Sequence, residues 1–347
     1  MTNWGDSNKE VGQMQISQSG SPLVSVVIPS YNRAHLLSRT INSVLAQTFQ
    51  DFELIVVDDG SEDETPRVLQ EFCDPRIRLL RLGRNYGGNH ARNRGLQAAR
   101  GPWMAFLDSD DEWLPGMLEQ QVARARETHD TRATVVLCLC EQREGRSRHT
   151  MPSTGLLQEG DLFDSLLLGR KPSTTSAFIA RKSALLEVRG FDERLSSHHE
   201  VDLWLRLARA RHRFLAVNEV LVIKYNHPGP RISNDAASQI RGFQEFDRRW
   251  GPAIRERLGM GVYEQWKERQ RAWRRHEQHV RLKDEVRSGK RALALRYALG
   301  MSRFLPLSLP LMLQALKLAA ADVSVIGAHT PSAETPNVDS DSDGSDL

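Results

Sequence analysis

Short apolar runs alternate with stretches of helical periodicity along the first third of the chain. The apolar runs are rich in β-branched residues, have the length of buried strands, and occupy residues 23–29, 52–57, 77–80 and 103–107. Apolar positions recur at helical spacing between them, over residues 36–45, 67–72 and 91–99. This alternation predicts an α/β fold in which a parallel sheet carries helices on both faces. Asn32 is the expected N-cap of the first helix.

Polar side chains follow three of these predicted strands at the point where each strand ends. Tyr31 and Asn32 follow the first, Asp58 and Asp59 the second, and the acidic run 108–112 the fourth. The carboxyl ends of parallel strands meet at one edge of a sheet, where open α/β sheets bind ligands. Carboxylate oxygens suit hard cations such as Mg²⁺ and Mn²⁺. An isolated acidic loop is usually only solvated, but this convergence predicts a nucleotide-type ligand bound with a divalent metal.

Composition narrows the class of protein. Of the 347 residues, 39% are hydrophobic and 26% charged, which is typical of a soluble globular protein. A net charge of +3 gives no support for nucleic acid as a partner. Cys73, Cys138 and Cys140 form no disulfide framework and fit a reducing compartment. Residues 1–20 lack the apolar core of a secretory signal, so the expected location is cytoplasmic.

Four motifs in sequence order carry a resemblance to a known family. They are VSVVIPSYNR, ELIVVDDGSEDET, NYGGNHARNRG and WMAFLDSDDEWLPGML. With this spacing the chain resembles the family 2 glycosyltransferases of the GT-A fold over residues 22–233. The resemblance implies a nucleotide-sugar donor, with a UDP-sugar expected, and a divalent cation, Mn²⁺ or Mg²⁺. It also implies inversion at the anomeric carbon and a glycan or lipid-linked acceptor.

The resemblance assigns several residues to the donor. Pro29 and Tyr31 match positions that flank the nucleoside, and Asp59 matches the carboxylate that reads the base, usually uracil. A carboxylate can accept a hydrogen bond from the imide N–H of uracil, which cytosine lacks. Arg92 is a further donor candidate from its own position, because it lies near the start of the predicted helix 91–99, where anions are favoured.

The metal candidates come from the fourth motif and from a later loop. Asp108 and Asp110 match the family's Asp-x-Asp motif. Asp110 is expected to bind the metal directly, and Asp108 to contact the ribose, the metal or a metal-bound water. Asp111 is a weaker candidate. His227 and Arg231 lie in a loop that reaches the metal or the pyrophosphate in relatives, so His227 is a metal candidate and Arg231 a donor candidate.

Residues 190–207, GFDERLSSHHEVDLWLRL, match a further motif but depart from it at one point. The family's Glu-Asp pair is replaced by His199 and Glu200. Glu200 falls on the position of the catalytic base, and His199 is the alternative because its ordinary pKa is nearer neutrality. Asp202 lies about 200° round a helix from Glu200 and should face another way. Trp204 is expected in the core or in a sugar-stacking wall.

The domain boundaries and the segments outside the motifs give less information about the chemistry. The sequence divides into a disordered lead (1–20), the glycosyltransferase domain (21–233), a helical C-terminal region (234–329) and a disordered acidic tail (330–347). The apolar stretch 304–326 is interrupted by proline and charged residues, and it is expected either to pack on the domain or to make a peripheral contact at the inner face of the membrane. Hydroxyl residues at 173–176 either meet the acceptor or form a polar strand entry.

Two other functions compete with sugar transfer. A nucleotidyltransferase would usually carry a glycine-rich loop with Arg and Lys after its first strand, whereas this chain has Ser30, Tyr31, Asn32 and Arg33 there. A non-catalytic binder of sugar nucleotides stays open because of the departure at His199 and Glu200. Release of the nucleoside diphosphate from a donor would exclude a pure binder.

Overall fold

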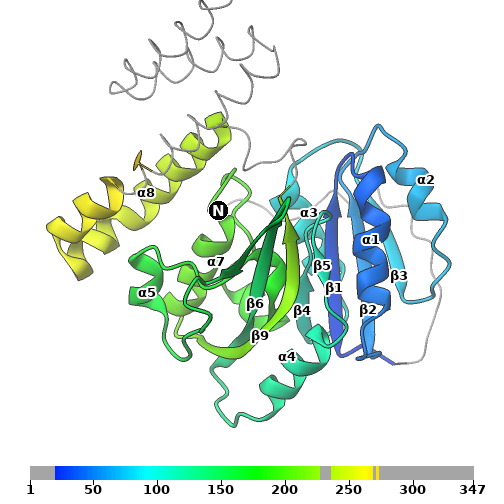
Figure 1. The fold of residues 1–347 in the computed structure, drawn as a ribbon, viewed down its shortest axis with the longest axis horizontal. Helices are drawn as coiled ribbons and strands as arrows, with labels where there is room; N and C mark the ends of the chain where they lie inside the picture. The colour runs from blue at the N-terminus through cyan, green and yellow to red at the C-terminus, as the bar shows by residue number, and fades with distance from the viewer. Residues whose placement is uncertain (1–19, 227–235, 269–270, 273–347) are drawn as a thin grey trace, which may run out of the picture. The chain divides into compact units, whose positions relative to one another are not determined.

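The computed structural model describes residues 20–226, 236–268 and 271–272. The contacts of the chain separate a compact unit, Met1–Trp266, from a second, Lys267–Leu347, and the fold in Figure 1 is that of the first unit. The candidates His227 and Arg231 lie outside the described residues, as do the segments 1–19, 304–326 and 330–347. Among the described residues, no helix is both long and apolar enough to cross a bilayer.

Strands and helices alternate through most of the first unit. In chain order they are β1 (Val24–Ser30), α1 (Ala34–Leu45), β2 (Phe52–Asp58), α2 (Thr65–Gln70), β3 (Ile77–Arg81), α3 (Gly88–Ala98), β4 (Trp103–Phe106), β5 (Glu112–Trp113), α4 (Met117–Arg126), β6 (Ala133–Glu144), β7 (Ser147–Met151), α5 (Phe163–Leu167), the 3₁₀ turn η1 (Thr175–Ala177), β8 (Phe178–Arg181), α6 (Lys182–Glu187), α7 (His199–Arg209), β9 (Arg213–Tyr225) and α8 (Ala236–Leu258).

The strands form one mixed sheet in the order β3-β2-β1-β4-β8-β6-β9-β5, with β7 paired to β6. Strands β3, β2, β1 and β4 are parallel neighbours, as the alternating pattern predicts. Beyond them β8 runs antiparallel to both β4 and β6, and β6 and β9 are parallel. The parallel half therefore brings the ends of β1, β2 and β4 to one edge, and the antiparallel strand β8 joins it to the second half.

Successive residues of the central strands point to opposite faces of the sheet. Val27 and Ile55 belong to one apolar cluster, to which α3, α7 and α8 contribute. Val26 and Leu54 belong to the other, which α1 and α4 cover. The prediction of helices on both faces is confirmed (Figure 1). Helix α3 lies especially close to the sheet at Gly95, where a Cβ atom would lie 2.4 Å from Val27 Cγ1.

The prediction that Asn32 caps helix α1 is wrong. The N-cap is Arg33, and Asn32 has a left-handed backbone (φ 52°). The Asn32 side chain accepts a hydrogen bond from the Glu62 amide at 2.9 Å instead. The amide of Arg33 is satisfied by the Thr65 hydroxyl at 2.9 Å. The sequence rule looks for a cap within the local segment, whereas here the first residue of α2, distant in sequence, supplies the acceptor.

Helix α8 shares the core of the sheet. Four of its buried side chains belong to the same apolar cluster as Val27: Phe243, Phe246, Trp250 and Ile254. The compact unit continues to Trp266, so the beginning of the predicted helical C-terminal region belongs to the same compact unit as the sheet. This packing matters for the site, because α8 contacts the first turn of α7.

Candidate active site

A pocket of about 780 Å³ opens at the carboxyl ends of β1 and β2. Its lining residues are Tyr31, Gly60, Ser61, Glu62, Arg81, Leu82, Gly83, Arg84 and Asn85. The donor candidate Tyr31 therefore lines this pocket. Pro29 is buried within β1, paired with Val57. Gly60 allows two walls of the pocket to approach, because its φ is +73° and a Cβ there would lie 2.5 Å from the Arg84 backbone.

The carboxylate of Asp59 ties the end of β2 to the loop that precedes α3. It accepts hydrogen bonds from the backbone amides of Tyr86 at 2.9 Å and Gly87 at 2.7 Å. Burial raises the pKa of Asp59, although these two bonds and the nearby His90 oppose the rise. Each carboxylate oxygen keeps a second lone pair, so Asp59 can still accept a hydrogen bond from a base.

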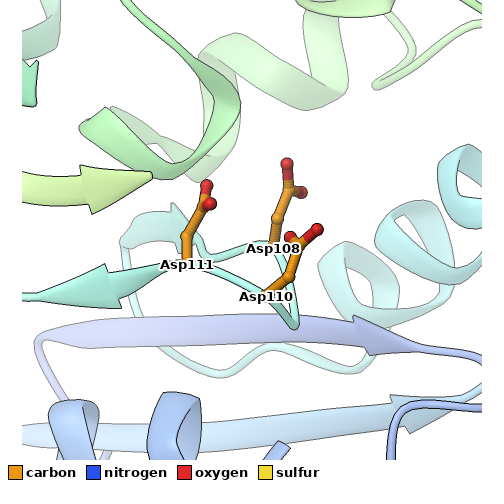
Figure 2. A group of neighbouring side chains, drawn as sticks. All are labelled: Asp108, Asp110 and Asp111. Carbon is orange, nitrogen blue, oxygen red and sulfur yellow. The ribbon is translucent and has the colours of Figure 1, made fainter. Parts of the chain in front are cut away.

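Three carboxylates lie together in the loop after β4. Oxygen atoms of Asp108, Asp110 and Asp111 lie within 4.8 Å of one another, and Figure 2 shows the side chains projecting from one short loop. Helix α1 holds the backbone of this loop. The Thr40 hydroxyl donates to the carbonyls of Ser109 at 3.0 Å and Asp111 at 2.9 Å.

Two basic side chains face this acidic cluster. Arg92 donates to Asp108 at 2.5 Å, and Lys224 lies 3.4 Å from Asp111. Burial would raise the pKa of Asp108, but the charges of Arg92 and Lys224 outweigh it and hold that pKa at about 2. Burial dominates at Asp111, which is fully buried, and raises its pKa to about 7.

The acidic cluster fits a divalent cation. Its ligand atoms would all be carboxylate oxygens, the type that Mg²⁺ and Mn²⁺ prefer. One oxygen of Asp111, Oδ1, is buried and has no hydrogen-bond partner among the described residues, which is costly unless a cation meets it. Asp108 and Asp110, with Asp111 beside them, are thus suited to hold a metal.

The 3₁₀ turn η1 connects the acidic cluster to helix α7. Ser176 Oγ donates to Asp111 at 2.6 Å and accepts from the Asp108 amide at 3.1 Å. The neighbouring Thr175 Oγ1 lies 3.5 Å from His199 Nε2. Ser173 donates to the Cys138 carbonyl at 2.7 Å. Of the two interpretations of the hydroxyl residues, these bonds favour a polar entry to the strand, and not a contact with the acceptor, for Ser173 and Ser176.

Glu200 lies in the first turn of α7 and is largely buried, with 11% of its side chain exposed. Lys171 donates to its Oε1, and His199 Nε2 lies 3.5 Å from Oε2. Burial would raise the pKa of Glu200, but the charge of Lys171 and its hydrogen bond hold it well below its ordinary value. Burial lowers the pKa of His199 to about 4. At neutral pH the site therefore presents an ionised Glu200 beside a neutral imidazole.

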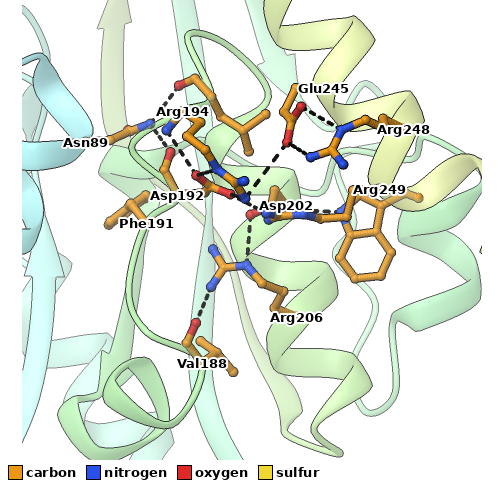
Figure 3. A network of polar contacts seen from close by, with 12 residues as sticks. Asn89, Val188, Phe191, Asp192, Arg194, Asp202, Arg206, Glu245, Arg248 and Arg249 are labelled. Carbon is orange, nitrogen blue, oxygen red and sulfur yellow. Dashed lines mark hydrogen bonds and ion pairs between the residues drawn. The ribbon is translucent and has the colours of Figure 1, made fainter. Parts of the chain in front are cut away.

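Asp202, the third candidate for the base, has a different environment. It is fully buried, and it accepts hydrogen bonds from Arg206 Nε at 2.8 Å, Arg249 Nη1 at 2.7 Å and Trp250 Nε1 at 2.9 Å. Figure 3 shows this network between α7 and α8. Asp202 thus fastens α8 to α7, consistent with its predicted position on another side of the helix. Trp204 is fully buried and packs edge-on against Phe178, so it lies in the core.

Sequence reasoning missed the basic partners of the carboxylates. Lys171 lies in the irregular segment between α5 and η1, and Lys224 near the end of β9. Neither belongs to a recognisable motif, and each meets its carboxylate only because the sheet order brings distant segments together. Only the unusual acidity of the neighbourhood, three aspartates and one glutamate, signals that basic side chains must be close.

The sequence is similar to known glycosyltransferases. The model of the family "Glycosyl transferase family 2" matches residues 25–190. The chain is 48% identical over 101 residues to a UDP-Glc:alpha-D-GlcNAc-diphosphoundecaprenol beta-1,3-glucosyltransferase of Escherichia coli, which is 29% of this chain and 40% of that enzyme. It is 30% identical over 236 residues to an uncharacterized glycosyltransferase of Rickettsia prowazekii, covering 65% of this chain and 70% of the relative.

Solved structures extend the likeness to the fold. S. aureus TarS 1–349, in complex with UDP-GlcNAc, is similar with a TM-score of 0.54 at 20% identity, over 70% of this chain and 78% of that one. The E. coli match covers well under two thirds of its relative's length. The chain therefore spans less than half the length of that relative, and the relative's whole activity does not pass directly to this chain.

Proposed function

The chain belongs to the family 2 glycosyltransferases and has the GT-A fold, and from this premise we propose that it transfers a sugar from a nucleoside diphosphate donor to an acceptor hydroxyl with inversion. The proposal rests on one observation: side-chain contacts connect the elements that carry the pocket, the acidic cluster and Glu200. Asp59 binds the loop before α3, Arg92 of α3 binds Asp108, and η1 joins the acidic cluster to α7.

The donor would occupy the pocket with its diphosphate toward the acidic cluster. Tyr31 lines the pocket, and Arg92 supplies a buried positive charge next to Asp108. Asp108 and Asp110 would hold Mn²⁺ or Mg²⁺, with Asp111 beside them. When bound, such a cation neutralises charge that develops on the departing diphosphate.

Glu200 would act as the general base. Its carboxylate is ionised at neutral pH, so it can take the proton of an acceptor hydroxyl. The hydroxyl oxygen forms a bond to the anomeric carbon from the side opposite the diphosphate, and the carbon–oxygen bond to the diphosphate breaks. One displacement inverts the anomeric carbon. Neutral His199, whose pKa burial lowers to about 4, is the alternative base, and the motif position favours Glu200.

A UDP-sugar and a lipid-linked glycan are the proposed substrates. The E. coli relative is named for UDP-glucose and for an acceptor on diphosphoundecaprenol, which supports both classes. The apolar segment 304–326 is proposed as a peripheral contact with the membrane that would hold such an acceptor.

The test is release of nucleoside diphosphate from a panel of UDP-, GDP- and dTDP-sugars with Mn²⁺, with and without a diphosphoundecaprenol-linked sugar. Release that depends on the acceptor, with a new glycosidic product, would support the proposal. Binding of donors without release would indicate a non-catalytic binder. Release of pyrophosphate from a nucleoside triphosphate would indicate a nucleotidyltransferase.

Asp110→Asn is expected to weaken donor binding in the presence of Mn²⁺ and to change metal-free binding little. Losing one carboxylate ligand should cost at least the roughly 10–100-fold that even outer-shell partners of a metal contribute. Calorimetry with a UDP-sugar, with Mn²⁺ and with EDTA, separates the two conditions. Equal affinity of wild type and variant in Mn²⁺ would exclude Asp110 as a ligand.

UDP is expected to bind more tightly than CDP, because the Asp59 carboxylate needs a donor N–H on the base. Asp59→Asn should reduce this preference by about tenfold or more, the scale of a hydrogen bond to a charged group. The measurement is competition of UDP and CDP against one labelled donor. Tighter binding of CDP to the wild type would contradict the assignment of Asp59. Unfolding of the variant must be checked by circular dichroism, because Asp59 also bonds Tyr86 and Gly87.

A further inference from the structure

Lys171 reaches Glu200 from a segment that is fixed on both sides. On one side, Gly169 has a left-handed φ of +76°, and a Cβ there would lie 3.0 Å from Trp266 Nε1. Its amide also donates to the Leu166 carbonyl at 3.0 Å. On the other side, Ser173 donates to the Cys138 carbonyl of β6 at 2.7 Å. The backbone around Lys171 is therefore anchored although it forms no regular element.

The residue just before α7 is also held in place, by contacts with α8. His198, just before the helix, has a φ of 61°. Its ring lies 5.5 Å from that of Phe246 and 6.2 Å from that of Phe243, both on α8. Glu200 follows two residues later. Residues of the C-terminal part of the compact unit thus support both Lys171 and Glu200.

The contact between Lys171 and Glu200 is asymmetric. Lys171 donates to Oε1, which leaves Oε2 on the side of His199. The Glu200 side chain is 11% exposed and that of Lys171 is 36% exposed, so Lys171 is the more exposed member of the pair. A carboxylate this buried needs a partner to stay charged. The groups that act on Glu200 are Lys171 and His199, and Arg92 and Asp108 act in turn on His199.

We propose that Lys171 is a positioning residue for sugar transfer, which holds Glu200 ionised through Oε1 and presents Oε2 to the acceptor hydroxyl. The proposal rests on the proposed role of Glu200 as the base. In the transfer step the hydroxyl proton moves to Oε2 while Lys171 keeps its own protons. Beside the ammonium a neutral Glu200 is disfavoured, so the proton passes on to water and the carboxylate is restored for the next turnover.

The experiment compares kcat from pH 3 to pH 9, at saturating donor and acceptor, for the wild type, Lys171→Met, Lys171→Gln and Lys171→Arg. Removing an opposite charge at this distance raises a carboxyl pKa by about 1–3 units. The base works only when ionised, so activity is lost as pH falls through that pKa. The acid limb should therefore move up by about 1–3 pH units in Lys171→Met and Lys171→Gln, and Lys171→Arg should stay near the wild type.

Arg170→Met is the matched control, because it removes a positive charge from the adjacent exposed residue. Its profile should follow that of the wild type, and donor affinity should be the same in every variant. Superimposable profiles for the wild type and both neutral Lys171 variants would overturn the proposal. The glutamine variant decides the result if the methionine variant fails to fold.

Titration of the Glu200 carboxyl by carbon NMR separates this inference from the proposed function. The Glu200 signal is identified by its absence in Glu200→Gln. If Glu200→Gln transfers sugar as fast as the wild type, the base assignment fails, yet a Glu200 pKa that rises in Lys171→Met still supports the pairing. An unchanged pKa in that variant would overturn the role of Lys171 whatever the activity.

Discussion

Glu200→Gln is expected to lower the turnover of sugar transfer by about 10²–10⁴-fold, the contribution of a general base, and to leave donor affinity nearly unchanged. Glutamine keeps the size of the side chain and its bond from Lys171, but it cannot accept the hydroxyl proton. Glu200 lies at the start of α7, on the far side of η1 from the acidic cluster, so the donor should not depend on its charge. Steady-state transfer and calorimetry with the donor measure the two effects.

Three companion variants make the result specific. Glu200→Asp restores the family's usual residue and should keep partial activity, because the carboxylate is retained with a shorter reach. His199→Ala should cost much less than Glu200→Gln. Glu193→Gln, an exposed acid that contacts His90 and Asn93, should leave turnover at the wild-type level. A fully active Glu200→Gln with an inactive His199→Ala would make the histidine the base.

The strands were predictable where a long apolar run is buried on both faces. The run at 52–57 becomes β2, whose seven residues are all buried. Strand β6 continues beyond its apolar run, which ends at Cys140, to Glu144, because pairing with β7 extends through residues such as Gln142 and Arg143. Polar residues in an exposed hairpin carry no apolar signal, so periodicity could not define that end.

The acidic residues of the site could be predicted from the sequence, but the lysines that balance their charge could not. The spacing of Asp108 and Asp110 after a buried strand indicates the carboxylate cluster without knowledge of the fold. Lys224 lies 113 residues from Asp111, and Lys171 lies 29 residues from Glu200. These contacts depend on strand order and on the anchoring of an irregular segment. Local sequence rules contain neither, so the electrostatic setting of the site needed the three-dimensional structure.

The second prediction with a large expected effect concerns Asp202, whose replacement should change the stability of the protein and not the transfer chemistry. Asp202→Ala is expected to lower the free energy of unfolding by about 3–5 kcal/mol, the cost of removing one partner from a buried ion pair. The side chain is fully buried, and its loss leaves Arg249 and Trp250 of α8 and Arg206 of α7 without their shared acceptor (Figure 3). Arg249 keeps one contact, with Asp192. Urea or guanidinium unfolding followed by circular dichroism gives the value.

Asp164→Ala is the matched control for this measurement. Asp164 also pairs with an arginine of α8, Arg257, but both side chains are about half exposed, 51% and 52%. Exposed ion pairs contribute about 0–1 kcal/mol, so this variant should unfold close to the wild type. The difference between the two variants then measures what the buried network of Asp202 adds beyond a single exposed ion pair with α8, because the residue type and the substitution are the same. If Asp202→Ala is no less stable than Asp164→Ala, the attachment of α8 to α7 rests on the apolar contacts of Phe243, Phe246 and Trp250 instead, and the polar network of Figure 3 adds little to it.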